Sequence, residues 1–231
     1  MTDASSSTPA QQPPQQPLGC VIVPVTAFEQ NCTILWCTKT MEGVVIDPGG
    51  DLDEVLAAAE KYGVKITKIW VTHGHMDHCG AALDLSRRLS VPIEGPNEGD
   101  AFWLENLEQS GLKYGMTGCK PFTPDRWLHQ GDTVTVGDVT FDVYHCPGHT
   151  PGHVVFHNPD LHVAWVGDVL FRGSIGRTDF PRGDHDTLIK SITQTLWPLG
   201  DDTTFISGHG PTSTFGEERR TNPYVADKRF G

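Results

Sequence analysis

Short apolar runs rich in β-branched and aromatic residues recur along the chain, separated by turns rich in glycine and proline. Runs of this kind are typical of β-strands. In the first part of the chain they cover Cys20–Val25, Asn31–Cys37, Gly43–Ile46 and Lys65–Val71. In the second part they cover Thr133–Val136, Val139–His145, His153–His157, Leu161–Val166 and Thr203–Ile206.

Apolar residues at helical spacing appear between and after these strands. The clearest case is Asp51–Tyr62, in which the apolar residues share one face. The other predicted helices are Cys79–Leu89, Asn97–Ser110 and Asp186–Leu196, and residues 111–124 are predicted to be irregular. Several strands are apolar on both faces, so we expect two sheets packed together with helices outside.

A dense group of potential metal ligands directly follows the strand that ends at Val71. The sequence there is Thr72-His73-Gly74-His75-Met76-Asp77-His78, a turn between that strand and a predicted helix. Imidazole nitrogens and carboxylate oxygens suit zinc, iron or manganese and exclude a site made only of thiolates. Four ligands this close would crowd one ion, so they divide more naturally between two. A histidine-rich polar turn without metal is the alternative interpretation.

Three later strands also lead to a metal-capable residue with glycine beside it. These residues are His149, Asp168 and His209. Glycine lets the backbone approach a ligand site closely. If the strand ends share one edge of the sheets, the three side chains converge on the turn described above, as a dinuclear hydrolase requires.

These seven residues divide simply between two ions. One ion would take His73, His75 and His149. The other would take Asp77, His78 and His209, while Asp168 bridges both with its two oxygens. Two divalent ions with two carboxylates and a bridging hydroxide leave a local charge of about +1, which favours an anionic substrate. His145 and His153 are predicted to be structural, and Asp47 either orients a ligating histidine or simply forms a turn.

Composition narrows the class of protein. The 231 residues include 17 basic and 29 acidic ones, and the net charge of −12 disfavours a nucleic-acid partner. Residues 1–18 are rich in Ser, Thr, Pro and Gln, so we predict a disordered tail before one domain over residues 19–231. This tail lacks the features of a secretion signal, and no apolar run could span a membrane. We therefore expect a cytoplasmic protein with six reduced cysteines. The sequence predicts no oligomeric state.

The motif Thr72–His78, with the later His149, Asp168 and His209, resembles that of the metallo-β-lactamase superfamily. This resemblance spans about Cys20 to Tyr224 and implies an α/β fold, a four-layer αβ/βα sandwich with the metal site along one edge. Further stretches are similar to the short glyoxalase II-like hydrolases of the YcbL type; these are Pro24–Phe28, Pro121–Leu128, Cys146–Phe156, Gly176–Asp184 and Gly208–Pro211. The similarity implies a 2-hydroxyacyl glutathione thioester, such as lactoylglutathione, as the substrate.

The expected reaction is hydrolysis of that thioester at two divalent ions, zinc first, with iron or manganese as alternatives. A hydroxide shared by ions about 3.5–4 Å apart attacks the carbonyl, with Asp77 orienting it, and the thiolate leaves. The longer glyoxalase II enzymes bind glutathione through a helical domain after the last metal-binding histidine, whereas 22 residues follow His209 here. Arg177 is a candidate substrate contact, although an ion pair with Asp179 is the simpler role.

Other functions within the superfamily are alternatives. Persulfide dioxygenases look similar and use one iron, which His73, His149 and Asp168 would hold here. A nuclease needs a basic groove, which the net charge argues against. The β-lactamases are exported and lack a bridging residue equivalent to Asp168. A binding module that holds metal without turnover is the last alternative.

Overall fold

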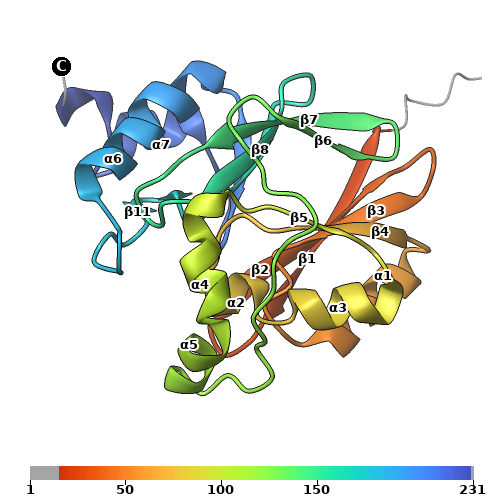
Figure 1. Ribbon diagram of the computed structural model, residues 1–231. Coiled ribbons are helices and arrows are strands. Elements are labelled where there is room, and N and C mark those ends of the chain that lie inside the picture. Colours follow the sequence, from red (N-terminus) through yellow and green to blue (C-terminus); the bar gives the residue numbers. More distant parts are fainter. Residues whose placement is uncertain (1–15, 230–231) are drawn as a thin grey trace, which may run out of the picture.

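The computed structural model describes residues 16–229, and its framework is two β-sheets packed face to face (Figure 1). The first sheet has the order β1-β2-β3-β4-β5. Its strands are β1 (Leu18–Val25), β2 (Gln30–Cys37), β3 (Glu42–Ile46), β4 (Lys65–Trp70) and β5 (Ile93–Glu94). β1, β2 and β3 pair antiparallel, whereas β3, β4 and β5 are parallel.

The second sheet has the order β13-β12-β9-β8-β7-β6. Its strands are β6 (Thr133–Val136), β7 (Val139–His145), β8 (Val154–Asn158), β9 (Val163–Gly167), β12 (Thr204–Ser207) and β13 (Ser213–Thr214). Only the β9–β12 pair is parallel among its pairings. A separate short hairpin joins β10 (Leu170–Phe171) to β11 (Ser174–Ile175).

Helices cover the outer face of each sheet. Those in the first half are α1 (Leu52–Lys61), α2 (Met76–Cys79), α3 (Ala82–Leu89), η1 (Glu98–Asp100), α4 (Ala101–Glu105) and α5 (Leu107–Lys113). Those in the second half are α6 (His185–Lys190), η2 (Ser191–Leu196), η3 (Trp197–Leu199), α7 (Phe215–Thr221) and η4 (Asp227–Arg229). In Figure 1, α1 and α3 lie on one side of the molecule, and α6 and α7 lie on the opposite side.

Alternation along the strands creates separate cores on the two faces of each sheet. In β4, Ile69 packs with the helices of the first half, whereas the next residue, Trp70, points between the sheets. The Trp70 ring lies 5.5 Å from that of Phe141 and 4.9 Å from that of Phe156, measured between centroids. Burying each such side chain contributes about 1.5–3 kcal/mol. Three apolar clusters thus separate four layers, and the predicted αβ/βα sandwich is confirmed.

The predicted helices differ from the observed ones mainly by breaks. The Cys79–Leu89 prediction contains the end of α2 and all of α3, because the Ala81 amide bonds the Pro48 carbonyl instead of continuing a helix. The Asn97–Ser110 prediction is interrupted at Asn106, whose side chain donates to the Phe102 carbonyl. Helix α7 and strands β5, β10, β11 and β13 were not predicted, because they are charged or only two residues long.

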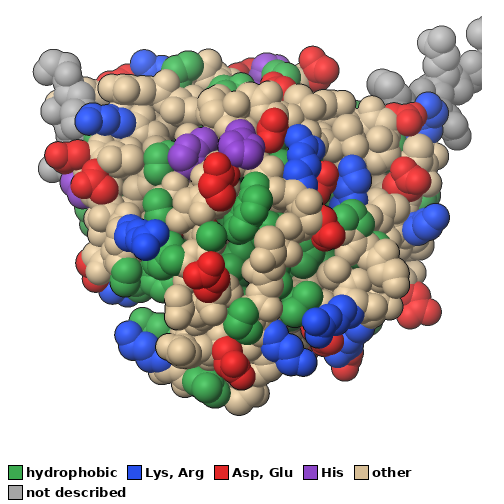
Figure 2. Space-filling model, in the orientation of Figure 1, with side chains coloured by type: hydrophobic (Ala, Val, Ile, Leu, Met, Phe, Trp, Pro, Cys, Tyr) green, Lys and Arg blue, Asp and Glu red, His purple; other side chains and the backbone are tan. Residues whose placement is uncertain are grey.

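Two further predictions concern the chain start and the surface. Residues 1–15 of the predicted tail lie outside the described residues, and Leu18, predicted to be its last residue, begins β1. Figure 2 shows basic and acidic side chains interspersed on one face, without a continuous basic strip. Within residues 16–229, none of the helices combines the length and apolar character needed to cross a bilayer.

Candidate metal centre

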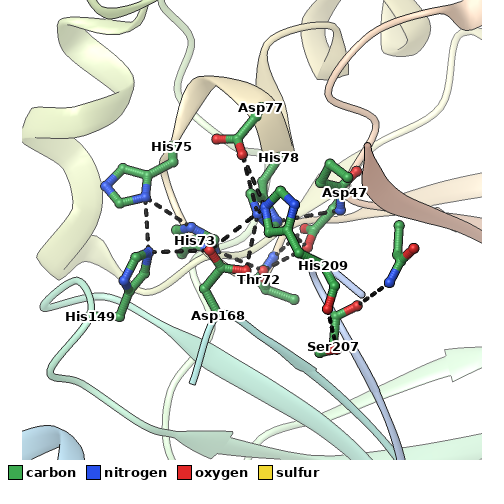
Figure 3. A network of polar contacts seen from close by, with 12 residues as sticks. Asp47, Thr72, His73, His75, Asp77, His78, His149, Asp168, Ser207 and His209 are labelled. Carbon is green, nitrogen blue, oxygen red and sulfur yellow. Dashed lines mark hydrogen bonds and ion pairs between the residues drawn. The ribbon is translucent and has the colours of Figure 1, made fainter. Parts of the chain in front are cut away.

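All seven predicted ligands meet at one edge of the two sheets, where several strands end. His73, His75, Asp77 and His78 follow β4, His149 lies between β7 and β8, Asp168 follows β9, and His209 follows β12. Figure 3 shows His75 and His149 on one side of the cluster, Asp77 and His209 on the other, and Asp168 between them. The two sheets therefore contribute ligands to one shared site.

One group consists of His73, His75 and His149, all of them buried. His75 Nδ1 lies 3.1 Å from His73 Nε2 and 3.0 Å from His149 Nε2. Three nitrogens at such distances surround a point where one ion can bind. His75 would therefore coordinate through Nδ1, and the other two through Nε2.

A second group consists of Asp77, His78 and His209. Asp77 Oδ2 lies 3.2 Å from His209 Nε2 and 3.8 Å from His78 Nε2. The two groups have the same members as the two sets of ligands that we assigned to separate ions from the sequence.

Asp168 connects the two groups. Its Oδ2 lies 3.6 Å from His149 Nε2 and 3.8 Å from His209 Nε2, and its Oδ1 lies 3.3 Å from His78 Nε2. A side chain at Gly208 would place Cβ 2.2 Å from Asp168 Oδ1, so glycine is required for this close approach. Asp168 is thus placed to bridge.

Hydrogen bonds on the far side of the ring set the orientation of three of the histidines. His78 Nδ1 donates to Asp47 (2.9 Å), and His209 Nδ1 donates to the Phe28 carbonyl (3.1 Å). His149 Nδ1 donates to the Arg177 carbonyl at 2.7 Å. In each case Nε2 is left facing the cluster, as a metal site requires.

Asp47 is an orienting residue rather than only part of a turn. Besides His78, its carboxylate accepts from the Thr72 amide and hydroxyl, both at 2.7 Å. The Thr72 hydroxyl lies 3.1 Å from His73 Nδ1 and can accept from it. One buried carboxylate therefore orients ligands of both groups.

The electrostatics of the cluster differ between its two sides. Burial and the neighbouring His149 lower the pKa of His75 to about 3. Burial also lowers the pKa of His78, but the charges of Asp168 and Asp77 outweigh it and raise that pKa well above its usual range. Burial raises the pKa of Asp168, yet the surrounding histidines, His78 first, hold it far below normal. The carboxylates are thus ionised, as metal ligands must be.

The donor set fits divalent cations. His78 Nε2 and Asp168 Oδ1 are buried and lie 3.3 Å apart, but neither forms a hydrogen bond, to the other or to any group within the described residues. Unpaired buried polar atoms are costly unless a ligand satisfies them. Nitrogen and carboxylate donors suit zinc, iron and manganese.

The cluster forms the floor of a pocket of about 610 Å³. Its walls include Phe28, Trp103, Tyr114, Phe171 and Phe180, and its cations are Lys113, Arg172 and Arg177. Arg177 forms the predicted ion pair with Asp179 (2.7 Å) and stacks over Phe180. Within residues 16–229, Lys113 and Arg172 have no acidic partner. The pocket therefore has apolar walls with positive charge.

The chain belongs to the metallo-β-lactamase superfamily, whose family model matches residues 25–209. It is a metal-dependent hydrolase of that superfamily. Among curated proteins, hydroxyacylglutathione hydrolase GloC of Haemophilus influenzae is 44% identical over 208 residues, which cover 90% of this chain and 98% of that protein.

Two solved structures resemble the whole described fold. The B3 metallo-β-lactamase BLEG-1 has a TM-score of 0.82 and 33% identity, covering 90% of this chain and 99% of its own. TTHA1623, in a di-iron-bound form, has a TM-score of 0.81 and 35% identity, covering 89% and 100%.

Several residues of the site were not predicted. His153, predicted to be structural, is buried, stacks on His73 and accepts the Asp168 amide at 3.0 Å. Trp103 and Asp100 also border the cluster, although neither belongs to a recognisable sequence pattern. Lys113 and Arg172 lie in segments predicted to be irregular or left unassigned. These residues act through spatial contacts that spacing does not reveal.

Proposed function

We propose that the protein hydrolyses thioesters of glutathione with 2-hydroxy acids, such as lactoylglutathione, at two divalent metal ions. The observation that carries this proposal is the position of Asp168 between two groups of three ligands, at the floor of a pocket with cations. The similarity to hydroxyacylglutathione hydrolase GloC over nearly its whole length supports the same substrate class.

The residues of the chain have distinct roles in this reaction. When bound, the ions supply an activated water and positive charge at the carbonyl oxygen. Asp77 borders the pocket floor and is placed to orient the attacking water. A thiolate leaves readily, so the site needs no strong general acid. The aromatic walls shield the reacting groups from bulk water.

The thiol half of the substrate would lie toward the cations. Glutathione carries two carboxylates and one ammonium group, so its net charge is negative. Lys113 and Arg172 are better placed to bind these carboxylates than Arg177, whose charge Asp179 already balances. Arg177 is therefore proposed to contribute mainly through its backbone carbonyl on His149.

The proposal includes the identity of the metal and the cellular location of the protein. Zinc is the first candidate, and the di-iron form of TTHA1623 supports iron as the alternative. A cytoplasmic location is supported by six cysteines without disulfide bonds.

Metal content and thioester hydrolysis measured on one sample, prepared without chelator, test this function. We expect near two ions per chain with turnover of lactoylglutathione. Asp168→Ala should lower both together, because it removes the bridging carboxylate. The exposed Asp160→Ala serves as the matched control and should change neither.

Two results would contradict the proposal. One iron per chain, with oxygen consumed on glutathione persulfide and no hydrolysis, would indicate the dioxygenase instead. Faster hydrolysis of a β-lactam than of the thioester would assign the activity suggested by the similarity to BLEG-1.

A further inference from the structure

Asp100, the last residue of η1, is a buried carboxylate outside the proposed ligand set. Its side chain is fully shielded from solvent. Burial raises its pKa to about 6, against three hydrogen bonds that stabilise the charged form. A buried carboxylate is costly unless its partners are fixed, so the groups that it contacts are informative.

Those partners are the two loops that carry His73, His75 and His149. Asp100 Oδ2 accepts from the Gly74 amide, between the first two histidines, at 2.8 Å. The same oxygen accepts from the Thr150 hydroxyl, next to His149, at 2.8 Å. Oδ1 accepts from the Gly152 amide at 2.6 Å. One carboxylate therefore joins the loop after β4 to the loop before β8.

The segment around Asp100 fits tightly against these loops. The Asn97 amide donates to the Gly152 carbonyl at 2.9 Å. A Cβ at Gly152 would lie 2.4 Å from the Asp100 nitrogen, so only glycine allows this approach. One turn further on, the Trp103 and His75 rings pack nearly perpendicular to each other, with 4.6 Å between ring centroids. The segment thus braces one ligand group from outside.

Asp100 and Asp47 act on different parts of the site. Asp47 bonds the ring of His78 directly and reaches that of His73 through Thr72. Asp100 instead bonds backbone amides and a hydroxyl beside the ligands. It can therefore set the distance between the two loops, which Asp47 does not join.

We propose that Asp100 is a positioning residue for the ion held by His73, His75 and His149. By fixing the separation of the two loops, it sets the distance between His149 and the other two histidines. This inference rests on the two-ion centre of the proposed function, but its test reads metal binding and not turnover.

Asp100→Asn is the informative variant, because asparagine keeps the shape but has only one acceptor atom. The amide N–H of asparagine would then face an N–H or O–H donor of Gly74, Thr150 or Gly152, and no hydrogen bond could form there. The affinity for zinc can be measured by competition between the protein and a chelator of known affinity. For one of the two ions, we expect this affinity to fall at least tenfold, which is the lower end of the effect of residues that hydrogen-bond metal ligands. Anomalous diffraction at limiting zinc should place the loss at the His73–His75–His149 group.

Glu218→Gln is the matched control. Glu218 is also buried and accepts from the Gly173 amide, the Ser213 hydroxyl and the Asn222 side chain, none of which belongs to the two loops that Asp100 joins. It should lose stability but bind both ions with unchanged affinity. Thr150→Val, which removes one donor at similar volume, carries the same test if Asp100→Asn does not fold.

Wild-type affinity for both ions in Asp100→Asn, or an equal loss in Glu218→Gln, would overturn the inference. A wild-type chain that binds one ion would instead contradict the two-ion proposal. In that case, Asp100→Asn must lower the affinity for the single ion if the positioning role is correct.

Discussion

Two cationic side chains at the pocket are available to a bound ligand. Lys113, at the end of α5, and Arg172, in the β10–β11 hairpin, face the pocket with no acidic partner in the described part of the chain. Their charges are available to a ligand, whereas that of Arg177 is balanced.

Lys113→Gln should raise the KM for lactoylglutathione about two- to fivefold, which is the range of an exposed ion pair. The kcat should stay within error, because the lost contact binds substrate and transition state equally. Steady-state kinetics at low and high salt check this, and salt should weaken the wild-type advantage. Lys120→Gln, an exposed lysine outside the pocket, is the control. A fall in kcat at constant KM would contradict the assignment.

At this scale the sequence pattern singles out the proposed ligands but not the residues that support them. Four of them lie within the six residues His73–His78, and the others follow apolar strands beside glycine, so the pattern can be recognised in the sequence. Asp100 bonds groups 26, 50 and 52 residues away, mostly backbone amides that any residue offers. No side-chain pattern could have pointed to it.

Hydrogen bonds from one strand position a loop that carries a candidate ligand. The first residues of β2 bind the loop after β12, since the Asn31 amide donates to the Gly208 carbonyl at 2.7 Å. The Asn31 side chain donates to the Ser207 carbonyl at 3.0 Å and to the Gly210 carbonyl at 2.8 Å. His209 lies between these anchor points, so a strand of the first sheet positions a ligand of the second.

Asn31→Ala should lower the free energy of unfolding by about 1–3 kcal/mol, because it removes two hydrogen bonds to backbone carbonyls. It should also weaken binding of the ion held by Asp77, His78 and His209. Denaturant unfolding and zinc competition measure the two effects. Asn158→Ala removes two comparable bonds, to Thr140 and Leu161, and should cost stability without changing metal affinity. Equal loss of affinity in both variants would contradict a local role.

Strands were predicted more accurately than helices for a physical reason. Strands β2, β3 and β8 are buried on both faces, so their apolar runs are continuous and their limits are visible in the sequence. The helices near the site are short. They end where a backbone amide bonds a group distant in sequence instead of the preceding helical turn, as at Ala81. Helical spacing continues across such breaks, and the predicted helix Cys79–Leu89 therefore runs from the last residue of α2 through the whole of α3.

Across the whole molecule, buried and half-buried histidines of two kinds should govern the free energy of unfolding in the absence of metal. Burial lowers the pKa values of His73 and His153 well below the usual range. For His78 and His209, burial has the same effect, but nearby aspartates outweigh it and raise both pKa values. The two kinds impose opposite dependences on pH.

The free energy of unfolding of the metal-free protein should be greatest near the histidine pKa of the unfolded chain, about 6.5. At lower pH the unfolded chain binds more protons, because His73 and His153 stay neutral when folded, so stability falls. At higher pH the folded chain retains protons on His78 and His209 that the unfolded chain releases, so stability falls again. Denaturant unfolding with chelator from pH 5 to 8.5 measures this. A steady rise across that range would contradict it.

The candidate ligands of each group are divided between the two sheets, and this has a consequence for how the protein would acquire metal. During synthesis, a growing chain already displays His73 to His78 long before His149 and His209 exist. An ion captured at that stage would have incomplete coordination and would exchange freely with the surroundings. Which metal the mature protein contains should therefore depend on what is available after translation, when both sheets have closed around the centre.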